Sequence, residues 1–217
     1  MLEVVNLIPT KDEWNKALCE RHGEELQQKF SSATIAICGL GGLGSNIAIS
    51  LARVGIGKLI LIDFDKVDIT NLHRQQYKAN QIGMCKTEAL QNNLKEINPY
   101  LETKIHTICL DESNAKDVLA DADIICEAFD NAEAKANIVN FVLSEMPDKY
   151  IVAASGMAGL DSANLIKTRK VSKRFYLCGD EVSDIKDGIG LVSTRVMLCA
   201  AHQAHTVLRI IAEEYEV

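Results

Sequence analysis

The sequence predicts one α/β domain of the doubly wound class, in which helices cover both faces of a mainly parallel sheet. Between residues 34 and 154, short apolar runs alternate with helical patterns, as in parallel strands joined by right-handed crossover helices. The first run opens into glycines at G-x-G-x-x-G spacing, which is typical of a nucleotide-binding turn. At 217 residues the chain has no room for a second full-sized catalytic domain. We therefore expect one domain over residues 1–217, with residues 1–30 as an N-terminal helical extension.

Helical periodicity predicts a polar amphipathic helix over residues 11–30. Its expected contacts are Trp14, Leu18, Leu26 and Phe30. The elements expected next are strand 34–38, helix 42–54, strand 58–62, a long irregular segment and helix 86–97. In helix 86–97, Leu90, Leu94 and Ile97 lie on one face, and Pro99 ends the helix.

The alternation of strands and helices continues into the second half of the chain. The expected elements are a strand near 102–108, a helix near 113–120, strand 122–126, helix 131–145 and strand 149–154. The pattern then changes. Residues 162–173 are predicted to form one or two extended strands, and residues 190–214 a long apolar helix. The fold thus gains an extra C-terminal strand pair and a long C-terminal helix.

Composition and charge exclude several classes of protein. With 47% hydrophobic and 24% charged residues, the composition is that of an ordinary globular protein. A net charge of −7 argues against a general nucleic-acid-binding surface, so any phosphate site must be a local basic cluster. The first thirty residues lack an apolar signal segment, and no apolar run approaches the roughly 18 residues of a membrane span. We expect a cytoplasmic protein that binds neither nucleic acid nor membrane.

The glycine turn predicts a Rossmann-like phosphate site. Gly39 permits a tight turn, Gly41 lets the backbone approach a phosphate, and Gly44 lets the following helix pack closely on its strand. A phosphate would lie at the N-terminus of a helix beginning near Gly42, where free N–H groups and the helix dipole favour negative charge. Asp63 ends the next apolar run 19 residues after Gly44, close to the roughly 20 expected for a ribose-binding carboxylate. A turn that serves only packing is the alternative.

Polar residues gather where the predicted parallel strands end, the edge at which such sheets bind ligands. They are Asp63 and Asp65 after one strand, Asp130 and Asn131 after another, and Asn71, Arg74, Gln75 and Lys86 in or after the long irregular segment. A sugar-binding acid, two cations and a separate carboxylate suit a nucleoside triphosphate with Mg²⁺. The cations would offset the phosphate charge, and the second acid could hold the metal ion.

Each of these charged side chains also has a structural alternative. Arg74 could form a surface ion pair, Lys86 could be a solvated lysine, and Asp130 could be the N-cap of helix 131–145. At the level of function, a nicotinamide-dependent oxidoreductase would use the same glycine turn and Asp63. Such an enzyme normally needs a substrate domain, and it leaves the cations unexplained. A catalytically silent interaction module is a further alternative.

The seven cysteines form no C-x-x-C pair, which argues against both a disulfide framework and a four-cysteine zinc site. Cys38, Cys126 and Cys199 fall in apolar runs, where cysteine usually behaves as a small buried hydrophobic residue. Cys178 is the one candidate for a reactive thiol, because it stands beside a turn signal after a basic stretch. An inert loop cysteine is the alternative.

Taken in order, these motifs closely resemble those of the ThiF/MoeB family, relatives of ubiquitin-activating enzymes, over roughly residues 20–210. The motifs are Gly39–Ser45 (GLGGLGS), Asp63–Asp65 (DFD), Asn71–Gln75 (NLHRQ), Gly83 with Lys86, Ile97–Pro99 (INP) and Phe129–Asn131 (FDN). Later runs look like the short, zinc-free ThiF subgroup associated with thiamine biosynthesis. They are Ala154–Gly159 (ASGMAG), Tyr176–Asp180 (YLCGD) and Ala200–Ala204 (AAHQA).

The resemblance implies ATP-dependent adenylylation of the C-terminal glycine carboxylate of a small ubiquitin-fold sulfur carrier, giving an acyl-adenylate and pyrophosphate. The implied carrier is ThiS-like and ends in Gly-Gly; a molybdopterin-synthase-type carrier or another family substrate is the alternative. A homodimer is also implied, and the predicted C-terminal helix has apolar residues over several faces, more than one sheet face would readily cover. The implied ATP-binding residues are Gly39, Gly41, Gly42, Gly44, Asp63, Asp65, Asn71, Arg74, Gln75, Lys86 and Asn131. The implied catalytic residues are Arg74, Lys86 and Asp130, with Asp130 holding Mg²⁺ and Cys178 acting in a later sulfur-transfer step.

Several features depart from the family pattern. Many relatives carry two zinc-binding C-x-x-C pairs, and this chain has neither, so we expect no zinc. His202 and His205 lie about one helical turn apart and could ligate a metal, but packed or capped histidines are expected on an otherwise apolar helix. The run Leu191–Arg195 lacks the alanine-proline common in relatives. The family also uses an arginine from the neighbouring subunit's N-terminal region, which Arg21 matches only loosely.

Overall fold

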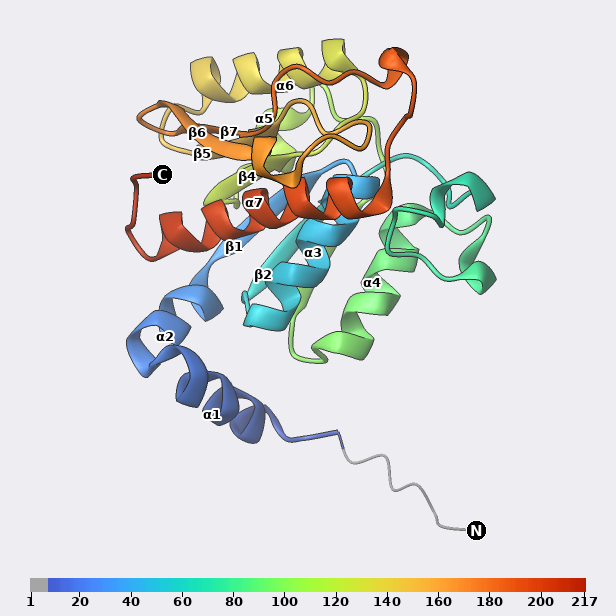
Figure 1. The fold of residues 1–217 in the computed structure, drawn as a ribbon. Coiled ribbons are helices and arrows are strands. Elements are labelled where there is room, and N and C mark those ends of the chain that lie inside the picture. Colours follow the sequence, from blue (N-terminus) through green and yellow to red (C-terminus); the bar gives the residue numbers. More distant parts are fainter. Residues whose placement is uncertain (1–7) are drawn as a thin grey trace.

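The computed structural model describes residues 8–217, and its centre is a seven-stranded sheet in the order β3-β2-β1-β4-β5-β7-β6 (Figure 1). The strands are β1 (Thr34–Cys38), β2 (Lys58–Ile62), β3 (Glu102–His106), β4 (Ile124–Glu127), β5 (Tyr150–Ala154), β6 (Lys167–Ser172) and β7 (Phe175–Gly179). All neighbouring strands are parallel except β6, which pairs antiparallel with β7 at one edge. The chain moves outward from β1 to β3 and then returns to β4 on the other side of β1. The carboxyl ends of β1 and β4 therefore form the switch point at which doubly wound sheets bind ligands.

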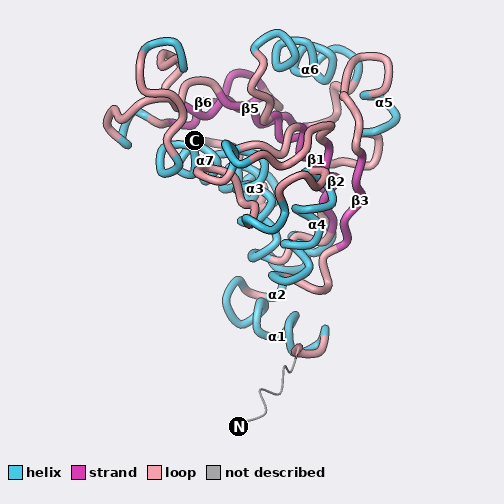
Figure 2. The backbone as a smooth tube through the Cα atoms, turned by 90° about the vertical axis from the view of Figure 1, so that its right-hand side faces the viewer, coloured by secondary structure: helices cyan, strands magenta, loops and turns pink. Residues whose placement is uncertain are grey.

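Helices cover both faces of the sheet, as the sequence predicts (Figure 2). They are α1 (Lys11–His22), α2 (Glu24–Ser32), α3 (Gly42–Val54), α4 (Lys86–Ile97), α5 (Ala115–Val118), α6 (Ala132–Glu145) and α7 (Ser193–Ile211). Alternate residues of a strand face opposite cores. Ile35 and Ile37 of β1 belong to the larger core, with α3, α4 and α7. Ala36 and Cys38 belong to the smaller core, with α5 and α6.

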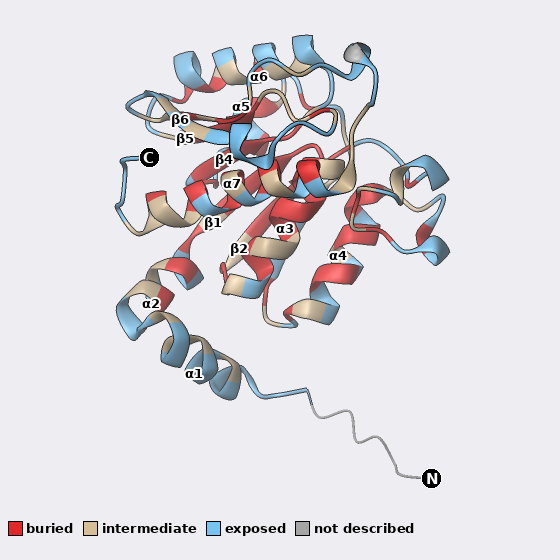
Figure 3. Cartoon of the chain, viewed as in Figure 1, coloured by how far each residue is buried: buried red, intermediate tan, exposed pale blue. Residues whose placement is uncertain are grey.

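The N-terminal extension differs from the prediction of one helix over residues 11–30. Gly23 has a φ of 83° and divides this segment into α1 and α2. Phe30 of α2 is buried in the larger core, whereas α1 has no buried residue. Figure 3 shows α1 mostly exposed and α3 mostly buried. The extension is thus anchored through α2.

Other differences lie in the second half of the chain. Strand β6 falls within the predicted 162–173, but its partner β7 lies beyond this range. The helix expected near 113–120 is the single turn α5. Helix α7 begins and ends three residues inside the predicted 190–214 and packs along α3. Among the described residues, no helix has the length and apolar character needed to cross a membrane.

Candidate functional site

The glycine turn joins β1 to α3 at the switch point of the sheet. A Cβ atom on Gly44 would lie 1.8 Å from the carbonyl oxygen of Gly39, so the first turn of α3 packs too closely for any side chain. Gly39 has a φ of 91° and lies against the backbone of Ala128. A Cβ on Gly41, by contrast, would meet only Gln75 Nε2, at 3.7 Å. Gly39 and Gly44 are therefore required by the fold, whereas Gly41 leaves room for a ligand to approach the backbone.

Two side chains hold the peptide of Leu40 at the centre of this turn. The N–H of Leu40 donates to Asp63 Oδ2 at 2.6 Å, and its carbonyl oxygen accepts the Tyr77 hydroxyl at 2.7 Å. Asp63 Oδ1 also accepts the N–H of Asp65 at 2.7 Å. Both carboxylate oxygens of Asp63 therefore fix the turn, and each keeps a lone pair for a further donor such as a ribose hydroxyl. Sequence reasoning missed Tyr77, because nothing in its neighbourhood indicates a buried hydroxyl.

Lys86 begins α4 and turns back toward the end of β2. Its Nζ lies 2.7 Å from Asp65 Oδ2 and 4.0 Å from Asp63 Oδ2, and the side chain is only 7% exposed. Burial raises the pKa of Asp63, and the nearby Lys86 ammonium opposes that rise. Lys86 is thus a buried, paired cation rather than the solvated lysine that was the alternative. It places an ammonium group at the edge where phosphates would lie, and the two carboxylates offset its charge.

The segment between β2 and α4 carries two polar side chains to the open side of the glycine turn. Gln75 is buried, and its Oε1 has no hydrogen-bond partner among residues 8–217. Arg74 Nε is also buried without a partner in the part of the chain that the structure describes. The Cγ of Arg74 lies 3.5 Å from the position of a Cβ on Gly42. Buried polar atoms normally find partners, so these two side chains keep hydrogen-bonding capacity beside the glycine turn, a donor on Arg74 and an acceptor on Gln75.

Asn71 and Arg74 differ in the contacts that their side chains make with neighbouring residues. Asn71 Oδ1 accepts the N–H of Asp68 at 3.0 Å in a reciprocal capping arrangement. Arg74 donates to the carbonyl oxygen of Thr70 at 3.2 Å and makes no ion pair with any residue from 8 to 217. Arg74 is therefore not the surface ion pair that was its alternative, and its charge is available to an anion.

Asp130 follows β4, next to the glycine turn. The N-cap of α6 is Asn131, whose Oδ1 accepts the N–H of Ala134 at 2.9 Å, so the alternative that Asp130 caps this helix is wrong. Asp130 is exposed, and its carboxylate makes no hydrogen bond or ion pair within the described chain. Free carboxylate oxygens beside a phosphate site are ligands that Mg²⁺ prefers, together with phosphate oxygens and water. Asp130 therefore fits a role as metal ligand.

Cys178 lies in strand β7 rather than in the loop position expected from the sequence. Its side chain is completely buried, and burial raises the pKa of its thiol to about 11. The sulfur lies 3.6 Å from Thr168 Oγ1 and 3.9 Å from Thr206 Oγ1. A thiol in this setting stays protonated at neutral pH, so the structure gives no support to a reactive thiolate. The sulfur-transfer role of Cys178 remains a prediction.

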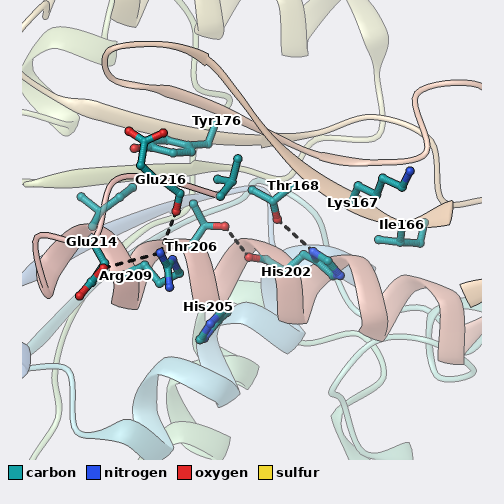
Figure 4. A pocket seen from close by; sticks show the side chains of 12 residues that line it. Ile166, Lys167, Thr168, Tyr176, His202, His205, Thr206, Arg209, Glu214 and Glu216 are labelled. Atoms are coloured by element: carbon teal, nitrogen blue, oxygen red, sulfur yellow. Dashed lines mark hydrogen bonds and ion pairs between the residues drawn. The ribbon is translucent and has the colours of Figure 1, made fainter. Parts of the chain in front are cut away.

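Close to Cys178, a cavity of about 490 Å³ lies between α7 and the β6–β7 pair (Figure 4). His202 Nδ1 is 2.9 Å from Thr168 Oγ1 at its wall, whereas His205 points away from Thr168. Burial lowers the pKa of His202. The two histidines do not converge, and no group of three or more potential metal ligands occurs within residues 8–217.

Sequence reasoning missed two ion pairs near the carboxyl edge, each of which has a buried carboxylate. Glu127, the last residue of β4, pairs with Lys135 of α6. Asp180, after β7, pairs with Arg195 of α7. Burial raises the pKa of Asp180, but hydrogen bonds from Ser183, Val182 and Arg195 outweigh it and hold the pKa at about 2. The only available signal was a charged residue at the end of an apolar run, which does not identify its partner.

The structure thus brings most of the predicted site residues together at one edge. Asp63, Asp65 and Lys86 are joined by direct contacts. Arg74 and Gln75 lie against Gly41 and Gly42. Asp130 and Asn131 follow the strand that pairs with β1. Cys178, by contrast, is buried between β6 and α7.

Comparisons with known proteins identify relatives of this chain. Residues 15–217 match the model of the ThiF family. The "Adenylyltransferase and sulfurtransferase UBA4" of Lodderomyces elongisporus is 28% identical over 196 residues, covering 87% of this chain and 42% of that protein. The "Adenylyltransferase and sulfurtransferase MOCS3" of Caenorhabditis briggsae is 35% identical over 119 residues, covering 54% of this chain and 30% of that protein. The chain therefore spans less than half the length of these relatives.

Solved structures share the fold over most of the chain. The E. coli tRNA N6-threonylcarbamoyladenosine dehydratase TcdA, in complex with ATP, superposes with a TM-score of 0.84 and 21% identity, covering 95% of this chain and 98% of that one. E. coli MccB with ATP superposes with a TM-score of 0.67 and 22% identity, covering 88% of this chain and 59% of that one.

Proposed function

This chain belongs to the ThiF family, and on that premise we propose that it uses ATP to adenylylate the C-terminal glycine carboxylate of a small ubiquitin-fold sulfur carrier. The observation that carries the proposal is the cation Arg74, which makes no ion pair among residues 8–217 and lies against Gly42 of the glycine turn, beside the open backbone of Gly41. The same fold holds ATP in TcdA and MccB. The curated relatives UBA4 and MOCS3 carry adenylyltransferase in their names.

The proposed reaction needs no nucleophile from the protein. The carrier carboxylate attacks the α-phosphorus of ATP, the bond from that phosphorus to the bridging oxygen breaks, and pyrophosphate leaves with the electron pair. The enzyme therefore has to align two anions and offset the charge that develops on the phosphates. The first turn of α3 provides unpaired N–H groups for a phosphate, and Arg74 and Lys86 provide positive charge.

The remaining polar residues would hold the rest of the nucleotide. Asp63 would accept a ribose hydroxyl with its free lone pairs, and Asn71 and Gln75 would donate to phosphate oxygens. Asp130 would hold Mg²⁺ together with oxygens of the triphosphate. When bound, this ion would neutralise phosphate charge and improve pyrophosphate as a leaving group.

We propose a ThiS-like carrier that ends in Gly-Gly, and hence a place in thiamine synthesis, from the resemblance of the later motifs. A carrier of the molybdopterin-synthase type is the alternative within the same chemistry. The test is intact-mass analysis and pyrophosphate exchange with ATP, Mg²⁺ and purified carriers of each type. The expected result is a carrier-dependent gain of one AMP group. Nucleotide binding without any AMP transfer to these carriers would refute the proposed substrate, and absence of nucleotide binding would refute the proposed activity.

The proposed homodimer rests on the family resemblance. Of the apolar residues of α7, Val196, Cys199 and Val207 are buried in the chain's own core, whereas Leu208 and Ile211 are only partly buried. Light scattering at micromolar concentration should give about twice the chain mass of 23.9 kDa. A monomer would remove the homodimer and any role for Arg21 in a neighbouring site.

A further inference from the structure

An ion pair with a buried carboxylate joins the two sides of the loop that carries Asp130. Glu127 is completely buried, and Lys135 Nζ lies 2.7 Å from its Oε1 and 2.6 Å from its Oε2. The same Oε1 accepts the N–H of Phe129 at 2.7 Å. One carboxylate therefore ties the start of α6 to the backbone one residue before Asp130.

The backbone on both sides of Asp130 is held by further hydrogen bonds. Ala128 donates its N–H to the carbonyl oxygen of Cys38 at 2.8 Å. Asn131 caps α6 through its side chain, and its carbonyl oxygen accepts the N–H of Lys135 at 3.0 Å. The loop is thus fixed around Asp130, while the Asp130 carboxylate itself stays free within the described chain.

A third element holds the strand end from which this loop begins. Gln203 of α7 donates from Nε2 to the carbonyl oxygens of Glu127, at 2.9 Å, and of Val152, at 3.1 Å. The end of β4 is therefore held by a hydrogen bond from α7 as well as by the ion pair with α6. The hydrogen bond from Phe129 to Glu127 is thus one of the contacts that set the position of Asp130 relative to the glycine turn.

Stability alone does not require this arrangement. Burial raises the pKa of Glu127, with the Lys135 ammonium and the hydrogen bonds opposing that rise, so the carboxylate is costly to keep charged here. Well-packed apolar residues in place of a buried ion pair are often neutral or stabilising. The pair does fix the orientation of the nearby backbone, because hydrogen bonds from two donors to a charged carboxylate are more directional than apolar contacts.

We propose that Glu127 and Lys135 are positioning residues, which hold the loop Ala128–Asn131 so that Asp130 meets the metal ion bound with ATP. This inference rests on the proposed function. Neither side chain touches the substrate. Their loss should weaken binding of metal-bound ATP while leaving binding of metal-free AMP nearly unchanged, since AMP does not need Asp130.

The test compares four variants with the wild-type chain. Lys135→Met removes the cation, and Lys135→Arg keeps the charge and the donors. Glu127→Leu combined with Lys135→Met removes both charges, so it keeps the proposal testable if the single variant fails to fold. Lys58→Met is the control for losing a paired lysine of similar exposure. Lys58 pairs with Glu102 at 2.7 Å and is 26% exposed, against 23% for Lys135, but it begins β2, at the amino ends of the strands, and Glu102 is 66% exposed.

Calorimetry would measure the Kd for AMP without metal, and electron paramagnetic resonance would measure Mn²⁺ bound in the presence of ATP. The variants that lack the pair should bind Mn²⁺ with ATP at least tenfold more weakly than wild type, with AMP affinity changed less than threefold. Lys135→Arg should restore Mn²⁺ binding to within threefold, and Lys58→Met should change neither quantity. Circular dichroism would confirm that each protein is folded.

Two results would overturn the positioning role alone. One is a folded double variant that binds Mn²⁺ with ATP as tightly as wild type. The other is an equal loss of AMP and Mn²⁺ binding, which would indicate general damage to the site. If the wild-type chain binds no nucleotide at all, the proposed function fails and the positioning role fails with it.

Discussion

Replacing Gly41 by alanine should separate nucleotide binding from folding. A Cβ at this position meets only Gln75 Nε2, at 3.7 Å, which is ordinary van der Waals contact. The backbone of Gly41 has φ −74° and ψ −145°, which lies outside the two main regions open to alanine, so alanine adds backbone strain of about 1–3 kcal/mol. Alanine is a poorer N-cap than glycine, but it also lowers the entropy of the unfolded chain. Each effect is about 1 kcal/mol or less and they oppose each other. The backbone strain is therefore the larger effect, and the melting temperature should fall by roughly 2–12 °C.

The methyl group would nevertheless lie on the open side of the turn, where a phosphate should approach the first N–H groups of α3. Losing one hydrogen bond to a charged group costs about 1.5–3 kcal/mol, and each 1.4 kcal/mol is a tenfold change in Kd. We therefore expect Gly41→Ala to bind ATP roughly 10- to 100-fold more weakly than wild type. Isothermal titration calorimetry measures this directly, and thermal unfolding followed by circular dichroism checks the fold.

Substitutions at two other glycines serve as controls for Gly41→Ala. At Gly44 a Cβ would lie 1.8 Å from the Gly39 carbonyl oxygen, so Gly44→Ala should lower stability by about 3 kcal/mol or more through overpacking. At Gly190 nothing lies within 4 Å of a Cβ, so Gly190→Ala should bind ATP as wild type does. If Gly41→Ala is folded and binds ATP within threefold of wild type, the phosphate does not approach this turn and the reasoning is wrong.

Three further predictions concern acids and a thiol at the same end of the sheet. Asp130→Ala should keep its fold but lose roughly two orders of magnitude, about 3 kcal/mol, in pyrophosphate exchange; near wild-type turnover would exclude Asp130 from the site. Cys178→Ser should keep exchange within threefold of wild type, since adenylylation needs no thiol; a folded variant without exchange would contradict this. Asp180→Asn should destabilise the fold at pH 7 by roughly 3–5 kcal/mol in urea titrations, because Arg195 loses its buried counter-ion. The pKa of Asp180 is about 2 in the fold and 3.8 unperturbed, so its stabilisation is complete above about pH 4 and is lost toward pH 2. The difference between the two proteins should narrow across that range, and a constant difference would argue against this origin.

The elements around the nucleotide site were predictable because their signals are local. Buried parallel strands appear as continuous apolar runs, and β1 and β2 occupy the predicted residues. Helices α3 and α4 also have the predicted limits, since a glycine turn opens one and Asn98–Pro99 follows the other. The prediction of one helix over residues 11–30 failed at Gly23, which separates α1 from α2. Helix α1 has no buried residue, so no contact with the core holds the two segments in one continuous helix.

The sequence by itself determined the fold class, the glycine turn and which charged residues follow the ends of the strands, because strand order and turn geometry bring these residues to one edge. Only the tertiary structure decided how each side chain is used. Lys86 is buried against Asp65 across 21 residues, and Tyr77 holds Leu40 across 37. Cys178 lies in a strand beneath α7, so burial keeps its thiol protonated. Burial and pairing depend on segments that are distant in the sequence and meet only in the folded chain, and no local pattern records which of them will meet.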